Sequence, residues 1–283
     1  MACYIGLDIG GTKLMVAAAD QNLNILQRRR ADTPEGLQDG LSLLHTMISE
    51  VSDGLPILGI GTAIGGQLDW RTGIVSPLHQ PTWRNVPFKA IMEREWECAC
   101  HLDVDTNVAA LGEYVLGNEN GSLFYITVST GIGGGFVQQG RLYRGNNDAH
   151  PEFGHQSIPV HCRFPERVHC ECGAPDCLEA LASGNAIRRI YYKPAEQLDA
   201  SEWEEVTYHL AQGIRNAAMF YTPDVIVLGG GVAIGRGERL ISDVMAFLHD
   251  HLRVVPVPDV RLSKLGYDTA LMGALVLARD GLS

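Results

Sequence analysis

The stretch "YIGLDIGGTKLMVAAADQNLNILQRRR", Tyr4 to Arg30, predicts three short strands joined by tight turns, and the next segment has a helical pattern. The same order returns in the second half of the chain, where three strand-like segments again precede helical ones. The two sets of expected strands are Tyr4–Asp8, Lys13–Ala19 and Ile25–Arg30, and then Leu123–Ser129, Gly134–Gln138 and Arg141–Tyr143. This repetition predicts two α/β domains of related plan.

Strands and helices alternate elsewhere in the sequence, which favours mostly parallel, buried strands. The further strands are expected at Ile57–Ala63, Leu102–Asp105, Val225–Leu228 and Val260–Ser263. The helices are expected at Leu37–Val51, Phe88–Glu97, Val108–Leu116 (with Asn107 as N-cap), Leu178–Tyr191, Glu202–Tyr221, Arg239–Leu252 and Thr269–Ala278. We expect a small N-terminal domain over residues 1–115, against which a closing helix at about 270–283 packs back. A larger domain over residues 116–270 would carry the long loop Pro151–Cys177.

The composition indicates a globular protein, and it disfavours several partners. Hydrophobic residues make up 46% of the 283 residues and charged residues 19%, so the chain can bury a sizeable core. The formal net charge is -11 and no long basic run occurs, which disfavours nucleic acid as a partner. The N-terminal residues lack a signal-peptide pattern and no apolar run approaches a membrane span, so we expect a cytoplasmic protein without membrane association.

Three glycine-rich turns follow apolar strands. "LDIGGTK" (Leu7–Lys13) places Gly10 and Gly11 where backbone N–H groups are uncovered, next to Thr12 and Lys13. Such a turn can hold phosphate, although a plain hairpin turn explains it equally well. "TVSTGIGGG" (Thr127–Gly135) and "VIVLGGGVA" (Val225–Ala233) have the same character. Neither a Walker A loop nor a dinucleotide fingerprint is present, but three such turns favour a nucleotide cleft between two domains.

A pair of carboxylates comes at the expected end of a strand. Asp103 and Asp105 in "HLDVDTN" are two residues apart, so on a strand they would share a face and point toward one cleft. A carboxylate in this position could accept a proton from a hydroxyl that attacks phosphate. Helix capping or a solvated turn is the alternative interpretation.

Cysteines cluster in the long loop Pro151–Cys177. His155, Cys170, Cys172 and Cys177 form the pattern His-x14-Cys-x-Cys-x4-Cys, and three thiolates with one imidazole suit tetrahedral Zn²⁺. Gly173 can relieve the tight turn after Cys172. His161 or His169 could replace His155 as ligand, and simple burial of the cysteines is the alternative. With four protein ligands the metal would be structural. Cys3, Cys98, Cys100 and Cys162 are not expected to bind it.

The motifs "DIGGTK", "DTNVAALGE", "VSTGIGGG", "PEFGH", "CECGAPDCLEALASG" and "LGGG" occur in the order and approximate spacing of the ROK (repressor, open reading frame, kinase) sugar kinases. The chain resembles this family over essentially its whole length. The resemblance implies the actin-like, hexokinase-like ATPase fold, in which two ribonuclease-H-like domains close over ATP and a sugar. It also implies a homodimer.

The resemblance assigns roles to residues of this chain. It implies that Asp105 is the catalytic base and that Asp8 lies near Mg²⁺ and the phosphates, through water. It implies nucleotide contacts for Gly10, Gly11, Thr12, Lys13, Thr130, Gly131, Gly229, Gly230 and Gly231. It implies sugar contacts for Gly65, Gly66, Glu152, His155 and Glu179, with structural zinc on His155, Cys170, Cys172 and Cys177.

The expected activity is ATP- and Mg²⁺-dependent phosphorylation of a hexose at the 6-hydroxyl. "HPEFGH" resembles the fructokinase-like branch and favours a neutral hexose. Val104 and His79 stand where many relatives have asparagine, which leaves the sugar open, including an N-acetylhexosamine such as N-acetylmannosamine. A sugar-sensing regulator and a binding-only relic are the further alternatives. The first is disfavoured because only seven residues precede Asp8, and the second because Asp105 and the phosphate loops are intact.

Overall fold

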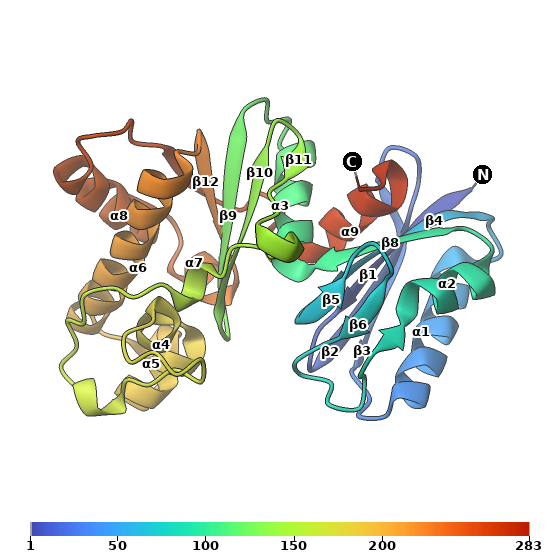
Figure 1. Cartoon of the computed structure of the whole chain (residues 1–283), viewed down its shortest axis with the longest axis horizontal. Coiled ribbons are helices and arrows are strands. Elements are labelled where there is room, and N and C mark those ends of the chain that lie inside the picture. Colours follow the sequence, from blue (N-terminus) through green and yellow to red (C-terminus); the bar gives the residue numbers. More distant parts are fainter. Residues whose placement is uncertain (1, 283) are drawn as a thin grey trace. The chain divides into compact units, whose positions relative to one another are not determined.

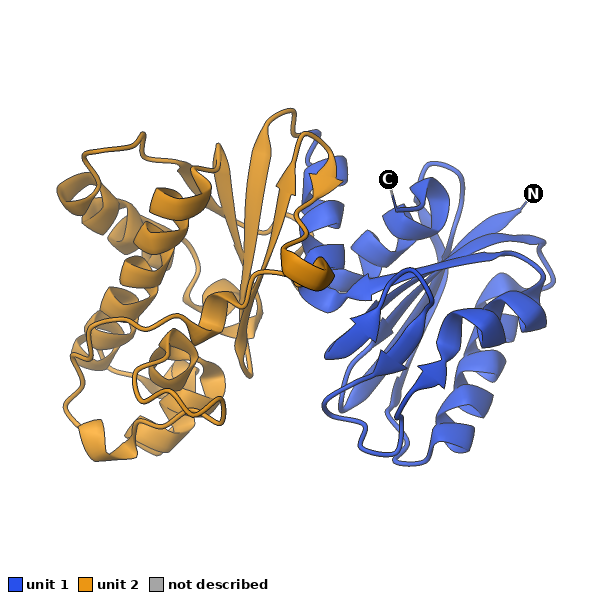
Figure 2. Ribbon diagram, in the orientation of Figure 1, with its two compact units in different colours: residues 1–118, 268–283 blue, residues 119–267 orange. Residues whose placement is uncertain are grey.

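The structure is a computed structural model that describes residues 2–282. The chain divides into two compact units, residues 1–118 with 268–283 and residues 119–267 (Figure 2). Each unit contains one five-stranded sheet, and the two sheets share one order of strands. In both, three antiparallel strands come first, and two later strands then add in parallel beside the first of them. The expected pair of α/β domains with related plan is therefore confirmed.

Unit 1 has the strand order β3-β2-β1-β4-β8 (Figure 1). Its strands are β1 (Cys3–Ile9), β2 (Lys13–Ala19), β3 (Ile25–Asp32), β4 (Ile57–Ile64) and β8 (Ala99–Val104). Its helices are α1 (Leu37–Ser52), α2 (Phe88–Trp96), α3 (Asp105–Leu116) and α9 (Thr269–Asp280). The segment between β4 and α2 contains a small sheet of β5 (Gln67–Asp69), β6 (Ile74–Ser76) and β7 (Val86–Pro87), whose strands are too short to give a periodic pattern.

The two faces of the unit 1 sheet have different side chains. Alternate residues of β1, among them Ile5 and Leu7, join the apolar core with residues of α1 such as Leu44 and Ile48. The opposite face is lined by glycine, because α9 lies directly on it. A Cβ at Gly61 would be only 1.9 Å from the Ala274 carbonyl oxygen, and one at Gly59 would be 2.6 Å from that of Ala278. The glycines of β1 and β4 thus let a helix backbone approach the sheet.

Unit 2 has the strand order β11-β10-β9-β12-β13. Its strands are β9 (Ser122–Val128), β10 (Ile132–Gln138), β11 (Arg141–Leu142), β12 (Val225–Gly229) and β13 (Asp259–Leu262). Its helices are α4 (Leu178–Ala182), α5 (Gly184–Tyr191), α6 (Ala200–Tyr221), α7 (Gly231–Arg236) and α8 (Glu238–His251). Phe124, Ile126, Leu210 and Ile214 are among the residues that form its core between the sheet and α6.

Two helix predictions need correction. The helix expected over Leu178–Tyr191 is two helices, because Ser183 has extended backbone and accepts a hydrogen bond from the Ala186 N–H as the N-cap of α5. The helix expected to begin at Val108 begins at Asp105, and its N-cap is Val104 rather than Asn107. Asp105 is therefore the first residue of a helix and not the last of a strand.

Candidate active site and metal centre

In unit 1, the predicted residues gather at one edge of the sheet. β1, β4 and β8 are neighbouring parallel strands, so their carboxyl ends meet at the same edge. Gly10 and Gly11 follow β1, Gly65 and Gly66 follow β4, and Asp105 follows β8. This edge is where open α/β sheets bind ligands.

The Asp105 carboxylate lies beside Gly65. A Cβ built on Gly65 would be 3.4 Å from Asp105 Oδ2, so residue 65 has no side chain against this oxygen. The other oxygen, Oδ1, accepts a hydrogen bond from the Thr106 N–H at 2.7 Å, which fixes the carboxylate at the start of α3.

Asp103 does not share the position of Asp105, contrary to expectation. Its side chain is buried, and its Oδ1 accepts from the Val104 N–H at 2.7 Å and from Asn107 Nδ2 at 3.1 Å. It stabilises the junction between β8 and α3. The prediction of a shared face failed because the strand ends at Val104, after which the helical backbone turns Asp105 in a new direction.

Asp8, at the end of β1, is electrostatically close to two other carboxylates. Burial, together with the negative charges of Asp105 and Asp268, raises the pKa of Asp8 to about 7. A buried carboxylate among like charges is stabilised by a nearby cation, and oxygen ligands suit Mg²⁺. These residues therefore fit a site for Mg²⁺.

Unit 2 repeats the arrangement with two parallel strands. The segment Ser129–Gly131 follows β9, and Gly230 and Gly231 follow β12, which ends at Gly229 and is paired in parallel with β9. Gly230 has φ +84°, and a Cβ there would be 2.5 Å from the Val128 carbonyl oxygen. Only glycine suits this position, because both the conformation and the space exclude a side chain.

Glu179 lies against the glycine turn after β9. Its Oε2 accepts a hydrogen bond from the Ile132 N–H at 2.8 Å, and a Cβ at Gly131 would be 2.6 Å from the same oxygen. Glu152 differs, since its side chain is exposed and lies 3.4 Å from His150 Nε2. The structure thus brings Glu179 to the predicted phosphate turn of unit 2.

Four predicted metal ligands lie together in unit 2. The ligand atoms of His155, Cys170, Cys172 and Cys177 are all within 4.8 Å of one another. His155 Nδ1 is 3.5 Å from Cys170 Sγ, and Cys172 Sγ is 3.3 Å from Cys177 Sγ. Because Zn–S and Zn–N bonds are about 2.3 and 2.0 Å long, the edges of a tetrahedral site are roughly 3.5–3.8 Å. The cluster therefore fits Zn²⁺. The distance between the sulfur atoms of Cys172 and Cys177 is too long for a disulfide bond.

The local backbone explains how distant ligands meet. Gly173 has φ +92° after the Cys-x-Cys turn, and its N–H donates to the Cys170 carbonyl. Ser157 pairs with Cys177 in an isolated bridge, which joins the His155 segment to the last cysteine. A hydrogen bond from the Ala174 N–H is the largest of several effects that lower the pKa of Cys172 to about 7. The geometry selects His155, rather than His161 or His169, for the described cluster.

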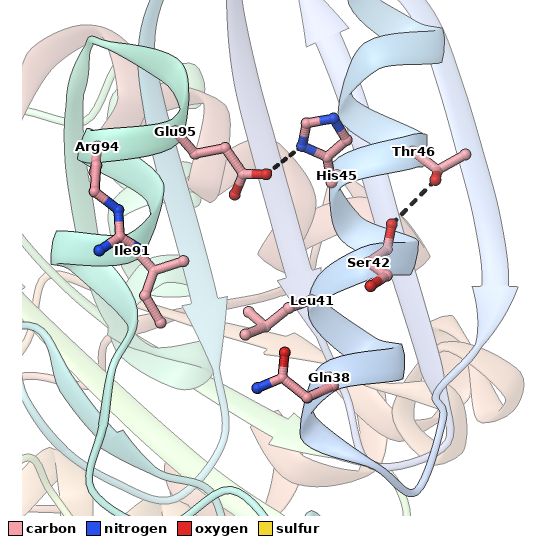
Figure 3. A pocket seen from close by; sticks show the side chains of 8 residues that line it. All are labelled: Gln38, Leu41, Ser42, His45, Thr46, Ile91, Arg94 and Glu95. Atoms are coloured by element: carbon pink, nitrogen blue, oxygen red, sulfur yellow. Dashed lines mark hydrogen bonds and ion pairs between the residues drawn. The ribbon is translucent and has the colours of Figure 1, made fainter.

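A hollow of about 760 Å³ lies elsewhere in unit 1, between α1 and α2 (Figure 3). Gln38, Leu41, Ser42, His45, Thr46, Ile91, Arg94 and Glu95 line it, and His45 pairs with Glu95 across it. It contains no residue predicted for nucleotide, sugar or metal. The hollow is therefore separate from the candidate active-site residues.

Three residues near the predicted ones were missed from the sequence. Asp268 acts electrostatically on Asp8, and Thr33 and Gln80 both bind the carbonyl of Gly10. Asp268 directly precedes a helix, and Asp105 directly follows a strand. A single acidic residue at either kind of position is too common in sequences to indicate a functional site. Thr33 and Gln80 come from segments whose patterns gave no reason to place them at the glycine turn.

The ROK family model matches residues 4–281, and the chain belongs to the ROK family. It is 30% identical to a glucokinase of Thermotoga maritima, covering 98% of this chain and 97% of that one. It is also 30% identical to a fructokinase of Zymomonas mobilis, covering 97% and 96%.

A solved structure shows the same fold. A ROK family glucokinase from Streptomyces griseus, in complex with glucose and AMPPNP, superposes with a TM-score of 0.80 at 26% identity, covering 99% of this chain and all of that one. The expected actin-like ATPase fold is thereby confirmed. Within residues 2–282, a search for a helix with the length and apolar character of a membrane span finds no candidate.

Proposed function

We propose that this ROK family protein is a hexose kinase, which transfers the γ-phosphoryl group of ATP to the 6-hydroxyl of a neutral hexose. The observation that carries the proposal is the position of Asp105, at the edge where three parallel strands also present Asp8, Gly10 and Gly65. The glucokinase and fructokinase relatives support the sugar class, and the relative in complex with AMPPNP supports the nucleotide.

Asp105 is assigned the role of general base. As the 6-oxygen of the sugar attacks the γ-phosphorus, Asp105 Oδ2 accepts its proton, and the bond from phosphorus to the β,γ-bridging oxygen breaks to release ADP. The Thr106 N–H on Oδ1 holds the carboxylate in one orientation, and Gly65 places no side chain against Oδ2. A base held within reach of the hydroxyl contributes about 10²–10⁴-fold to such a step.

The glycine turns are assigned to the polyphosphate. Gly10, Gly11, Thr12 and Lys13 in unit 1, and Thr130 and Gly131 in unit 2, offer backbone N–H groups, hydroxyls and one cation. Gly229, Gly230 and Gly231 are assigned to the nucleoside side. Asp8 would hold Mg²⁺, and this ion would neutralise phosphate charge, which is the main requirement of phosphoryl transfer beyond positioning.

Sugar contacts are assigned to Gly65, Gly66 and Asp105 in unit 1 and to Glu152, His155 and Glu179 in unit 2. An ionised carboxylate accepts from two hydroxyls, so Glu179 can select a sugar that has them. His155 turns Nδ1 toward Cys170, which leaves Nε2 for a hydroxyl. Structural Zn²⁺ on the four-residue cluster would hold His155 in place directly. It would hold Glu179 indirectly, because Glu179 comes two residues after the ligand Cys177.

A sugar panel tests the proposal. Purified, zinc-loaded protein is assayed with Mg²⁺ and ATP against glucose, fructose, mannose, N-acetylglucosamine and N-acetylmannosamine, and ADP release and the phosphorylated position are measured. We expect sugar-dependent ADP release with one of the neutral hexoses and a 6-phosphate product. Absence of turnover with every sugar, in protein shown by circular dichroism to be folded, would reject the kinase function.

A further inference from the structure

The carbonyl group of Gly10 is held by two side chains from distant segments. Thr33 Oγ1 donates to the Gly10 oxygen at 2.8 Å, and Gln80 Nε2 donates to the same oxygen at 2.8 Å. The Gly10 N–H is also engaged, since it donates to the Lys13 carbonyl at 3.0 Å. The orientation of this glycine is therefore fixed from outside the turn, by residues 33 and 80.

Fixing this carbonyl also fixes the next N–H group. In a planar trans peptide the C=O of one residue and the N–H of the next point in opposite directions. The bonds from Thr33 and Gln80 therefore make the Gly11 N–H point away from both side chains. In residues 2–282, no protein group accepts a hydrogen bond from that N–H, which leaves it for a ligand.

Gln80 belongs to a segment that is itself firmly anchored. Its side chain is 4% exposed, and Arg84 Nη1 donates to the carbonyls of Pro77, Gln80 and Trp83 at 2.8–2.9 Å. The same segment packs on both glycine pairs of the unit. A Cβ at Gly11 would be 2.4 Å from His79 Cβ, and one at Gly66 would be 2.6 Å from the Leu78 nitrogen.

The corresponding turn in unit 2 is anchored in the same way but by main-chain groups. The Gly184 N–H donates to the Ser129 carbonyl at 2.7 Å, and the Asn185 N–H donates to the Thr130 carbonyl at 3.1 Å. The first turn of α5 thus fixes the carbonyl that precedes Gly131, as the side chains of Thr33 and Gln80 fix the carbonyl that precedes Gly11. Only in unit 1 can the anchor be removed by changing side chains.

We propose that Thr33 and Gln80 are positioning residues for phosphoryl transfer, which hold the Gly10 carbonyl so that the Gly11 N–H faces the polyphosphate of ATP. The inference rests on the proposed kinase function. It also makes the Pro77–Trp83 segment a physical connection between the sugar-side glycine Gly66 and the phosphate turn.

Thr33→Val and Gln80→Met test the inference, because each removes one donor and keeps most of the side-chain volume. We measure kcat, the KM for ATP and for the hexose, and the affinities of AMPPNP and adenosine by calorimetry. Either remaining donor can still hold the carbonyl, so each single variant should lose about 3-fold in kcat/KM for ATP. The double variant should lose about 100-fold, as when a preorganised backbone donor is removed.

The ratio of the two affinities separates positioning from a general structural role. AMPPNP affinity should fall in the double variant while adenosine affinity stays within about 2-fold, since adenosine has no phosphate. Thr33→Ser should restore the Thr33→Val loss. Thr46→Val and Gln38→Met are matched controls, because both residues are exposed on α1, and they should leave all values unchanged.

Two results would overturn the inference. One is a folded double variant with unchanged kcat/KM for ATP, and the other is an equal loss of AMPPNP and adenosine affinity. If the double variant does not fold, the affinities of AMPPNP and adenosine are compared in the two single variants instead, and an equal loss of both would overturn the inference. If the wild-type protein phosphorylates no sugar, the kinase function fails, while the AMPPNP and adenosine titrations still decide whether Thr33 and Gln80 position a phosphate-binding turn.

Discussion

Gly65 faces the carboxylate of Asp105, and a single methyl group added to this glycine would lie 3.4 Å from Asp105 Oδ2. Gly65 directly follows β4 and Asp105 begins α3, and the two residues meet because β4 and β8 are paired in parallel. Because residue 65 is glycine, it places no side chain against this carboxylate oxygen.

Asp105→Asn should abolish most turnover without loss of sugar binding. The amide keeps an oxygen for the Thr106 N–H but cannot accept the hydroxyl proton, so kcat should fall by about 10²–10⁴-fold. Steady-state kinetics and a glucose titration check this. Asp250→Asn, an exposed position near the end of α8, should behave as the wild type. A normal kcat in the Asp105 variant would remove this residue from its role.

Cys172→Ser should release the metal. Hydroxyl oxygen is a poor replacement for thiolate, so zinc measured by mass spectrometry should fall from about one ion per chain to near zero. The KM for the hexose should rise roughly ten-fold, because His155 and Glu179 lose their support. Cys98→Ser, outside the cluster, should keep its zinc. Full zinc occupancy in the Cys172 variant would contradict the assignment of ligands.

Gly131→Ala should disturb Glu179. The new Cβ would be 2.6 Å from Glu179 Oε2, so the carboxylate must move. Displacement of a positioning group by about 1 Å can cost 10²-fold, and we expect kcat/KM for the hexose to fall about 10- to 100-fold. Gly235→Ala is the matched control, since no atom lies within 4 Å of its added Cβ. Equal kinetics for the two variants would show that Glu179 does not contact the sugar.

Stability should depend on pH through His209, which is buried in α6 and accepts a hydrogen bond from the His161 N–H at Nε2. Burial is the largest of the effects that set its pKa at about 4; Glu205 opposes this shift and His161 adds to it. In the unfolded state this histidine becomes protonated near pH 6.5. The contribution of neutral His209 to the free energy of unfolding is therefore fully present above that pH and is lost as the pH falls toward 4. It is on the order of 3 kcal/mol.

Urea unfolding at several pH values between 7.5 and 4.5 measures this effect. His209→Gln should flatten the pH dependence of the unfolding free energy relative to the wild type, because glutamine accepts the same N–H and does not titrate. His249→Gln, exposed on α8, should keep the wild-type slope. Identical slopes for the wild type and the His209 variant would contradict the prediction.

Much of the architecture could be predicted from the sequence, because strands such as Leu123–Ser129 and Val225–Leu228 are strongly apolar and a glycine comes within two residues after each. The metal cluster was also predictable, since three of its ligands fall within eight positions. The contacts around Gly10 were not, because they depend on which side chains the fold brings to its carbonyl. Thr33 and Gln80 are separated from Gly10 by 23 and 70 residues, a relation that no local pattern encodes.

Local predictions failed where tertiary packing decides the backbone. The helix begins at Asp105 because Asp103 and Asn107 bind each other beneath it, whereas local preference favoured Asn107 as a cap. The small sheet of β5, β6 and β7 has strands of two or three residues, too short for any periodicity. Such elements exist only because neighbouring segments hold them.

The glycine-lined face under α9 has a consequence for how the protein is made. β1 and β4 are synthesised first, but the helix that covers Gly59 and Gly61 is translated after all of unit 2. During translation this face of the nascent sheet stays open, while the residues of unit 2 are contiguous and can fold as they leave the ribosome. The second unit should therefore mature before the first, although its residues come later in the chain.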